Sequence, residues 1–327
     1  MKNYILSSLF IFFLILCLPL SGFPLKGNNV DAYTVKNEQT ADSSDSLRVL
    51  QASTGNILTL DFQDYLIGAV AAEMPASFSE EALKAQSVAC YTYALWIIEN
   101  ADRAPDSLFD ISDDSSKHQG YLTNADMKDK WGDKYEKYYS KIKKAVTETR
   151  GEYISFSSKP AMTVFHGLSS GKTVSAKELW GYDIPYLISV DAPGDKLSPD
   201  LISENEFTKE EFSKIVTGIT EQKASTDISA DVSDVTRDGY LNKLSINGAE
   251  IGRSDIRSAF SLKSSCFKIQ ITEDQVIFSV YGRGHGIGMS QYSADFMARQ
   301  GYDYKEILGH FYPGTELKEN KHLQNGF

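Results

Sequence analysis

Glu73 is the acidic residue best placed by its sequence context to act as a general acid. It follows an apolar stripe at helical spacing, formed by Leu66, Ala69 and Val70, so a helix here puts its carboxyl on an apolar face. Pro75 disfavours the helical conformation for the residue before it, which places Glu73 in the last turn. Partial burial and the negative end of the helix dipole both disfavour the charged carboxylate. We therefore predict a carboxyl that holds its proton near neutral pH, as a general acid must.

A structural role for Glu73 is the alternative. A glutamate at a helix end is more often solvated or ion-paired than catalytic, and Lys84 is the nearest candidate partner. Lys84 lies about two turns into the next predicted helix, where its ammonium would orient the carboxyl.

The stretch Phe165–Thr173 is a second candidate, because it gathers hydroxyls, an imidazole and an amine in a loop after a predicted strand. Its last residues are similar to a phosphate loop, but His166 occupies the position of the earlier glycine, which argues against nucleotide binding. These side chains fit a groove that hydrogen-bonds sugars through Ser169, Ser170 and Lys172. From the pattern alone, a self-contained turn is the preferred interpretation.

A third candidate is the glycine-rich run Gly282–Tyr292, between a predicted strand and a predicted helix. Its glycine spacing differs from that of a dinucleotide-binding loop. Glycine at every second position from 282 to 288 lets the backbone approach another group closely. His285 is expected either to bond the loop to itself or to contact a substrate, and Gln291 offers a further donor.

The elements that position these residues are helices and short strands in mixed order. Helical patterns cover two helices within 61–96, broken at Met74-Pro75, and a Lys- and Tyr-rich helix over 134–150. Alternation and turn signals indicate strands within 151–164, 240–246, 267–271 and 275–281. We predict one large mixed α+β domain in which helices flank short, mostly antiparallel strands.

The predicted chain organisation has four parts. Residues 1–24 contain an apolar run of intermediate length, read as an uncleaved membrane anchor in preference to a cleaved signal segment, with the body outside the cytoplasm. Residues 25–56 are read as a polar tether, 57–315 as the catalytic domain and 316–327 as a disordered tail.

Composition excludes some classes of function. A net charge of −11 argues against a nucleic-acid partner, since phosphate binding needs a basic face. Cys90 and Cys266, outside the apolar N-terminal run, are too few for a disulfide framework. A metal-dependent hydrolase built from His118, His166 and His285 is the least favoured hypothesis, and we expect neither a metal nor a cofactor.

Taken together, the runs Tyr65–Pro75, Glu81–Gln86 and Thr92–Ala94 resemble the stage II sporulation protein D family, also called the sporulation-protein-D/amidase-enhancer domain. With the runs at 165–173 and 282–292, the resemblance extends over about 58–314. It implies a lytic transglycosylase that cleaves peptidoglycan glycan strands stripped of stem peptides, in sporulation-linked remodelling of the septal wall.

The resemblance also implies roles for individual residues. Glu73 would protonate the glycosidic oxygen and then accept a proton from the muramic acid 6-hydroxyl, leaving a 1,6-anhydro end, with Lys84 orienting it. The strand would be held by side chains from the two loops: Ser169, Ser170, Lys172, His285 and Gln291.

Two departures from the family pattern keep a second function open. Ser112 stands where a zinc-binding Cys is often found, followed by only Lys117-His118, so no structural zinc is expected. Tyr91 replaces a common Arg, which would weaken charge support in the groove. The alternative is a non-catalytic peptidoglycan-binding module that enhances a cell-wall amidase.

Overall fold

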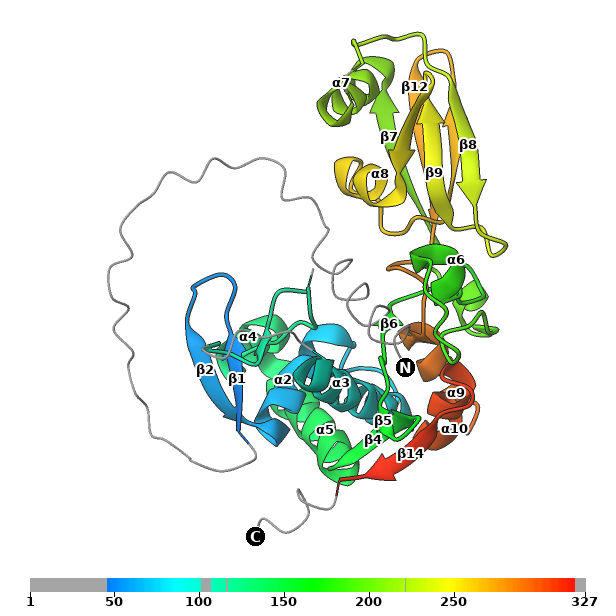
Figure 1. The fold of residues 1–327 in the computed structure, drawn as a ribbon. Helices are drawn as coiled ribbons and strands as arrows, with labels where there is room; N and C mark the ends of the chain where they lie inside the picture. The colour runs from blue at the N-terminus through cyan, green and yellow to red at the C-terminus, as the bar shows by residue number, and fades with distance from the viewer. Residues whose placement is uncertain (1–45, 101–106, 116, 221, 321–327) are drawn as a thin grey trace.

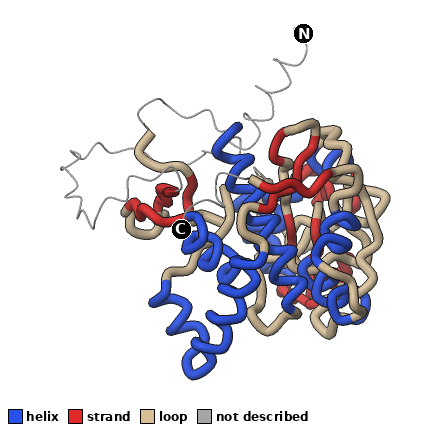
Figure 2. The backbone as a smooth tube through the Cα atoms, turned by 90° about the horizontal axis from the view of Figure 1, so that it is seen from below, coloured by secondary structure: helices blue, strands red, loops and turns tan. Residues whose placement is uncertain are grey.

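The computed structural model describes residues 46–100, 107–115, 117–220 and 222–320. They form one mixed α+β domain whose short sheets are mostly antiparallel, and Figure 2 shows helices and strands interspersed rather than separated into layers. The predicted α+β class is therefore confirmed. The predicted membrane anchor at 1–24 lies outside the described residues. Within the described ranges, no helix has both the length and the apolar character needed to cross a bilayer.

Two helices joined by a short loop position Glu73: α2 (Phe62–Glu73) and α3 (Glu80–Asn100). Asp61 caps α2 by accepting a hydrogen bond from the backbone N–H of Gln63 at 2.7 Å. Met74 is extended, with φ −117° and ψ 140°, and ends the helix as expected before a proline. Glu73 is therefore in the last turn, as predicted.

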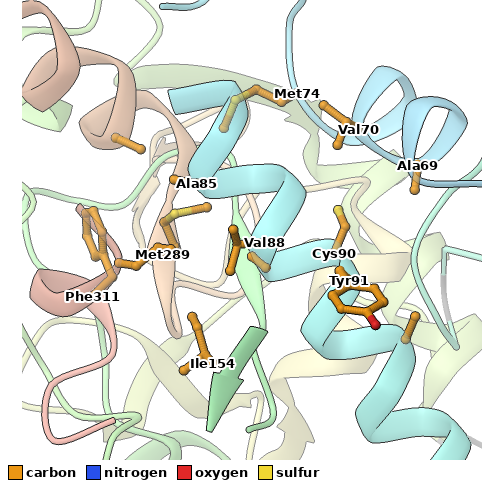
Figure 3. Packing of buried hydrophobic residues seen from close by; sticks show 14 of the residues in the cluster. Ala69, Val70, Met74, Ala85, Val88, Cys90, Tyr91, Ile154, Met289 and Phe311 are labelled. Atoms are coloured by element: carbon orange, nitrogen blue, oxygen red, sulfur yellow. The ribbon is translucent and has the colours of Figure 1, made fainter. Parts of the chain in front are cut away.

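Helix α3 runs through the larger of two hydrophobic clusters (Figure 3). Ala85 and Val88 lie near Met289 and Phe311 from the C-terminal part of the chain, while Val70 of α2 lies on another side of the helix. The small side chains of α3 allow this close approach from several directions. Elements far apart in sequence are thereby fixed relative to Glu73.

The folded domain begins earlier than predicted. Strand β1 (Ser46–Leu50) pairs antiparallel with β2 (Ile57–Asp61) and parallel with β3 (Ile111–Ser112). Leu47 and Val49 alternate along β1 and are fully buried in the larger cluster. The prediction of a polar tether is therefore wrong over residues 46–56, because this alternation supplies a core-facing strand.

The elements beside α3 include the last strand of the domain, which ends later than predicted. They are two helices, a short 3-10 turn and a small sheet: α4 (Asn124–Trp131), Gly132–Lys134, α5 (Tyr135–Glu148), β4 (Glu152–Phe156), β5 (Lys159–Pro160) and β14 (Glu316–Glu319). The strands predicted within 151–164 are confirmed as β4 and β5, which form a hairpin with Ser157 and Ser158 at φ 51° and 65°, as a type I′ turn requires. Strand β14 pairs with β4, so the predicted disordered tail is wrong over 316–319.

The second hydrophobic cluster lies at one end of the molecule, beyond α6 (Figure 1). Its core is a group of stacked and tilted rings that includes Phe212, Phe260 and Phe278. Two three-stranded antiparallel sheets, ordered β10-β9-β8 and β11-β12-β7, and two helices surround it. Their bounds are β7 (Ile202–Thr208), α7 (Lys209–Ile219), β8 (Ala230–Val235), β9 (Leu241–Ile246), β10 (Ala249–Gly252), α8 (Arg253–Ala259), β11 (Phe267–Ile271) and β12 (Gln275–Tyr281).

Asp195, in a 3-10 turn (Asp195–Leu197), ties together the loops between the two clusters. Its fully buried carboxylate accepts four hydrogen bonds of 2.6–2.7 Å, from the backbone N–H and hydroxyl of Ser169 and from the hydroxyls of Ser290 and Ser293. The elements it joins are β6 (Phe165–His166), β13 (Met289–Ser290) and α9 (Gln291–Arg299), with α6 (Ala176–Trp180) and α10 (Tyr304–Phe311) alongside. Three segments separated in sequence thus depend on one carboxylate.

We expect Asp195→Ala to lower the free energy of unfolding by roughly 3 kcal/mol or more, because four donors lose a charged acceptor in the interior. The matched control is Asp191→Ala, whose side chain is 72% exposed and forms an ion pair with exposed Lys172, and which should cost less than about 1 kcal/mol. Urea unfolding measures both. Equal midpoints for the two variants would contradict a central role for Asp195.

Candidate functional site

The carboxyl of Glu73 is half-buried and held by one backbone donor. The N–H of Gly120 donates to Oε1 of Glu73 at 2.5 Å. A Cβ at position 120 would lie 3.2 Å from both this oxygen and Cβ of Ala72, which is tighter than ordinary packing. Glycine at 120 therefore lets the loop backbone approach the carboxyl closely.

A second glycine brings that loop against α2. The backbone N–H of Leu122 donates to the carbonyl of Gly68 at 3.2 Å, and the ring of Tyr121 stacks on Tyr65 with centroids 5.9 Å apart. A Cβ at Gly68 would collide with the ring of Tyr121 and the carbonyl of Leu122. The absence of a side chain at Gly68 therefore lets the segment beside Glu73 pack directly against α2.

Lys130, at the end of α4, supplies the nearby positive charge. Its ammonium donates to the carbonyl of Ala71 at 3.0 Å, one of the unpaired carbonyls at the end of α2. Partial burial of the ammonium lowers the pKa of Lys130, while the charge of Glu73 acts to raise it. Sequence reasoning missed Lys130, because residues so far apart in sequence show no pattern that pairs them.

The electrostatic surroundings of Glu73 shift its ionisation equilibrium toward the protonated form. Burial raises the pKa of Glu73 above its ordinary value, and the hydrogen bond from Gly120 and the charge of Lys130 only partly oppose it. Tyr93 lies close enough to feel the same charge: burial, and then Glu73, raise the pKa of Tyr93, so its hydroxyl stays neutral. The Tyr93 ring stacks on Trp96 with centroids 6.1 Å apart, giving a half-buried aromatic pair near the acid.

A chain of buried amides connects this site to the C-terminal loop. Gln291 donates to Oε1 of Gln86 at 3.2 Å, and Gln86 donates to the sulfur of Cys90 at 3.2 Å. Gln119 donates to the carbonyl of Cys90 at 3.1 Å and to the hydroxyl of Tyr65 at 2.6 Å. The chain therefore ends at Gln119, one residue before Gly120, the donor to Glu73.

Known proteins match this chain over almost its whole length. The family model described as Stage II sporulation protein matches residues 51–156, which contain Glu73, Gly120 and Lys130. Stage II sporulation protein D of Bacillus subtilis (strain 168) is 33% identical over 98% of this chain and 96% of its own length. The chain belongs to the stage II sporulation protein D family.

Two further relatives show the breadth of the family. Stage II sporulation protein D of Bacillus amyloliquefaciens is 32% identical over 88% of this chain and 84% of the relative. The Amidase enhancer of Bacillus subtilis (strain 168) is 27% identical over 77% of this chain and 40% of the relative. This family membership links the chain to sporulation and cell-wall metabolism, and the resemblance read from the sequence is confirmed.

Lys84 does not orient the acid of this family member. Its ammonium binds Glu148 at 2.7 Å and Glu81 at 2.8 Å, which holds α3 against α5. Glu81 in turn accepts a hydrogen bond from the backbone N–H of Tyr304 at 3.0 Å. The predicted pairing of Lys84 with Glu73 is wrong, because closer carboxylates on α3 and α5 take its charge.

The loop after β6 is used mainly for internal contacts. Ser169 is fully buried, and its hydroxyl donates to Asp195, which leaves it no access to a glycan. Ser170 is half-buried and hydrogen-bonded to the side chain of Cys266. Lys172 is exposed in an ion pair of 3.2 Å with Asp191. Of the three predicted contacts, Lys172 is exposed, Ser170 is partly accessible and Ser169 is buried.

His285 and Gln291 also make internal contacts. Nδ1 of His285 accepts a hydrogen bond from the backbone N–H of Ile287 at 3.1 Å, and burial with nearby positive charge lowers the pKa of His285 to about 3. Its ring lies 5.8 Å from that of His166 and 5.7 Å from that of Trp180, centroid to centroid. Gln291 is 6% exposed and directed toward Gln86. Among the described residues, neither of the two is hydrogen-bonded to Glu73.

The two departures from the family pattern have structural explanations. Nδ1 of His118 accepts a hydrogen bond from the backbone N–H of Ser112 at 3.1 Å, which closes this loop. The described ranges contain no group of three metal-binding side chains, so the metal-hydrolase hypothesis gains no support. Tyr91 is buried against Phe62, at the opposite end of the 12-residue α2 and thus about 16 Å along the helix from Glu73. The Tyr91 side chain belongs to the core rather than to the site.

The raised pKa can be tested without an activity assay. A carboxyl with a raised folded-state pKa keeps its proton after the unfolded chain has released it, so stability falls as pH rises from the ordinary pKa of 4.5 to the raised one. We expect Glu73→Gln, which removes this titration, to gain stability relative to the wild type between about pH 4 and pH 8. Urea unfolding at both pH values gives the difference.

The control for that measurement is Glu136→Gln, an exposed position on α5. It removes one negative charge from the surface without touching the site. A stability difference for Glu73→Gln that fails to grow with pH, or that Glu136→Gln reproduces, contradicts the raised pKa.

Proposed function

We propose that this protein is a lytic transglycosylase that cleaves peptidoglycan glycan strands, preferably stripped of stem peptides, to 1,6-anhydro-muramic ends. The observation that carries the proposal is the carboxyl of Glu73, whose pKa is raised by burial and which lies next to one backbone donor and one ammonium. General acid catalysis requires such a protonated group close to neutral pH.

In this mechanism the two carboxyl oxygens have different roles. Oε1 accepts the N–H of Gly120, so the acidic proton is carried by Oε2 and is given to the glycosidic oxygen. The carboxylate formed is stabilised by Gly120 and by the charge of Lys130. It then takes the proton of the muramic acid 6-hydroxyl as that oxygen bonds to C1. The products are a free 4-hydroxyl and a 1,6-anhydro ring, and no water is consumed.

A single acid is the reason to prefer this reaction to hydrolysis. Glycoside hydrolases generally use two carboxyl groups, one as acid and one as nucleophile or water activator. Among the described residues, the groups that shift the pKa of Glu73 are Gly120 and Lys130, and neither is an acid. An intramolecular hydroxyl nucleophile needs no second carboxylate.

The second candidate function is a non-catalytic peptidoglycan-binding module that enhances a cell-wall amidase. The similarity to the relative named Amidase enhancer favours it, as does the internal use of Ser169 and Gln291. For either function we propose an extracytoplasmic location at the cell wall or sporulation septum, with residues 1–24 as a membrane anchor. Glycan strands, and for the second function the amidase, are the partners.

The test of catalysis compares wild-type protein with Glu73→Gln on denuded glycan strands. We expect 1,6-anhydro-ended fragments from the wild type and a rate lowered by roughly 10² to 10⁴ in the variant, the usual contribution of a general acid. Glu136→Gln serves as the control and should retain full activity. Mass spectrometry of the fragment ends measures the outcome. Glycan binding without fragments from the wild type would favour the amidase-enhancing module.

The pH profile tests the role of Lys130. The acid acts in its protonated form, so the rate should fall as pH rises through the pKa of Glu73. Lys130→Met removes a charge that lowers this pKa, and the falling limb should therefore move to higher pH. Lys134→Met, an exposed position after the same helix, should leave the limb unchanged. A limb that stays in place in Lys130→Met would rule out the electrostatic coupling.

A further inference from the structure

Two arginines near the junction of the two hydrophobic clusters have no acidic partner. Arg253 and Arg257 lie one turn apart on α8, so their side chains share one side of the helix. Both are half-buried. Within the described ranges, neither forms an ion pair with a carboxylate, in contrast to Arg48 with Asp110 and Arg299 with Asp295.

Hydrogen bonds from Arg253 lead toward α6. Its guanidinium donates to Oδ1 of Asn242 at 2.9 Å, and Nδ2 of Asn242 donates to the carbonyl of Glu178 at 3.3 Å. Two residues further along α6 is Trp180, whose half-buried ring lies 5.7 Å from that of His285, centroid to centroid. Arg253 is thus linked through Asn242 to α6, the helix that carries Trp180.

Hydrogen bonds from Arg257 lead to the same loop through the segment that follows α8. Nε of Arg257 donates to the carbonyl of Leu262 at 3.2 Å, and the next residue, Lys263, accepts the backbone N–H of Gly284 at 2.8 Å. Both arginines act electrostatically on His285, the residue after Gly284. The two guanidinium groups and the Trp180 ring therefore share one neighbour in the loop, His285.

The charges here are arranged to receive an anion. Each guanidinium has five N–H donors, of which one is used in the hydrogen bonds above. Burial without a compensating acid lowers the pKa of both arginines. Asp255, between them on α8, is exposed and on a different side of the helix. Two partly desolvated cations with free donors are an unfavourable arrangement unless an anion completes it.

We propose that Arg253 and Arg257, with Trp180, form a subsite that binds the lactyl carboxylate of a muramic acid residue. This rests on the proposed action on glycan strands and names what selects the strand. Two guanidinium groups suit a carboxylate, and an indole ring suits the apolar face of a sugar. In a muramic acid that bears a stem peptide, this carboxylate is an amide and carries no charge. The subsite therefore distinguishes a denuded strand from one that carries peptides.

Binding measurements test the subsite separately from catalysis. Full-length Glu73→Gln protein is titrated with denuded glycan strands and with the same strands after conversion of their lactyl carboxylates to methyl amides. We expect the carboxylate form to bind at least about tenfold more tightly, as charge-assisted hydrogen bonds require. With Arg253→Gln and Arg257→Gln added, the two strands should bind equally. The charge-matched control adds Lys223→Gln and Arg237→Gln at exposed positions and should keep the preference.

The outcomes separate this proposal from the proposed function. Equal binding of the two strands by the parent protein overturns the subsite, as does a preference that survives loss of both arginines or disappears in the charge-matched control. Unfolding midpoints of all variants show whether a lost preference reflects misfolding, and Arg253→Lys with Arg257→Lys should restore part of it. A carboxylate preference in a protein whose wild type cuts no strand would support the subsite and refute the transglycosylase.

Discussion

The candidate site depends on the environment of one carboxyl, which lies at the end of an apolar helix. Glu73 ends α2, where burial and unpaired backbone carbonyls disfavour negative charge, and the backbone N–H of the loop residue Gly120 donates a hydrogen bond of 2.5 Å to its carboxyl. That loop reaches the helix because Gly68 leaves room for Tyr121. Lys130 then binds a carbonyl at the helix end. Burial is needed to raise the pKa of the acid above its ordinary value. A hydrogen-bond donor is needed as well, because a buried carboxyl without one would be too costly to ionise during a reaction.

The remaining family motifs support this arrangement from a distance. Ser169, Ser290 and Ser293 bind Asp195 rather than solvent, and these hydrogen bonds join the loop after β6 to β13 and α9. Gln291 links these elements to α3 by its hydrogen bond to Gln86. Gln119 links α3 to the loop that holds Glu73 by its hydrogen bond to the carbonyl of Cys90. In the sequence, these hydroxyl and amide groups suggest ligand contacts. In the structure they form internal hydrogen bonds that stabilise a domain built from short elements.

The proposed subsite on α8 complements the acid rather than duplicating it. A single general acid protonates whichever glycosidic oxygen is bound next to it. Discrimination between glycan strands therefore requires a separate binding subsite. Arg253 and Arg257 come from the smaller cluster, whose own core of Phe212, Phe260 and Phe278 holds α8 in place. A second hydrophobic cluster would then carry strand recognition, while the larger one carries the acid.

The sequence alone determined the local features of this protein. Proline after Met74 ended α2 at Glu73, and alternation and turn residues marked strands such as β9, β11 and β12, because such signals act between near neighbours. Family motifs also identified the lineage. The partners of each charge were decided only by the tertiary structure. Lys84 looked close to Glu73 in sequence but binds Glu148, while Lys130 and Gly120 were brought in by packing. Coulomb energy depends on distance in space and on burial, and neither quantity can be read from spacing along a chain.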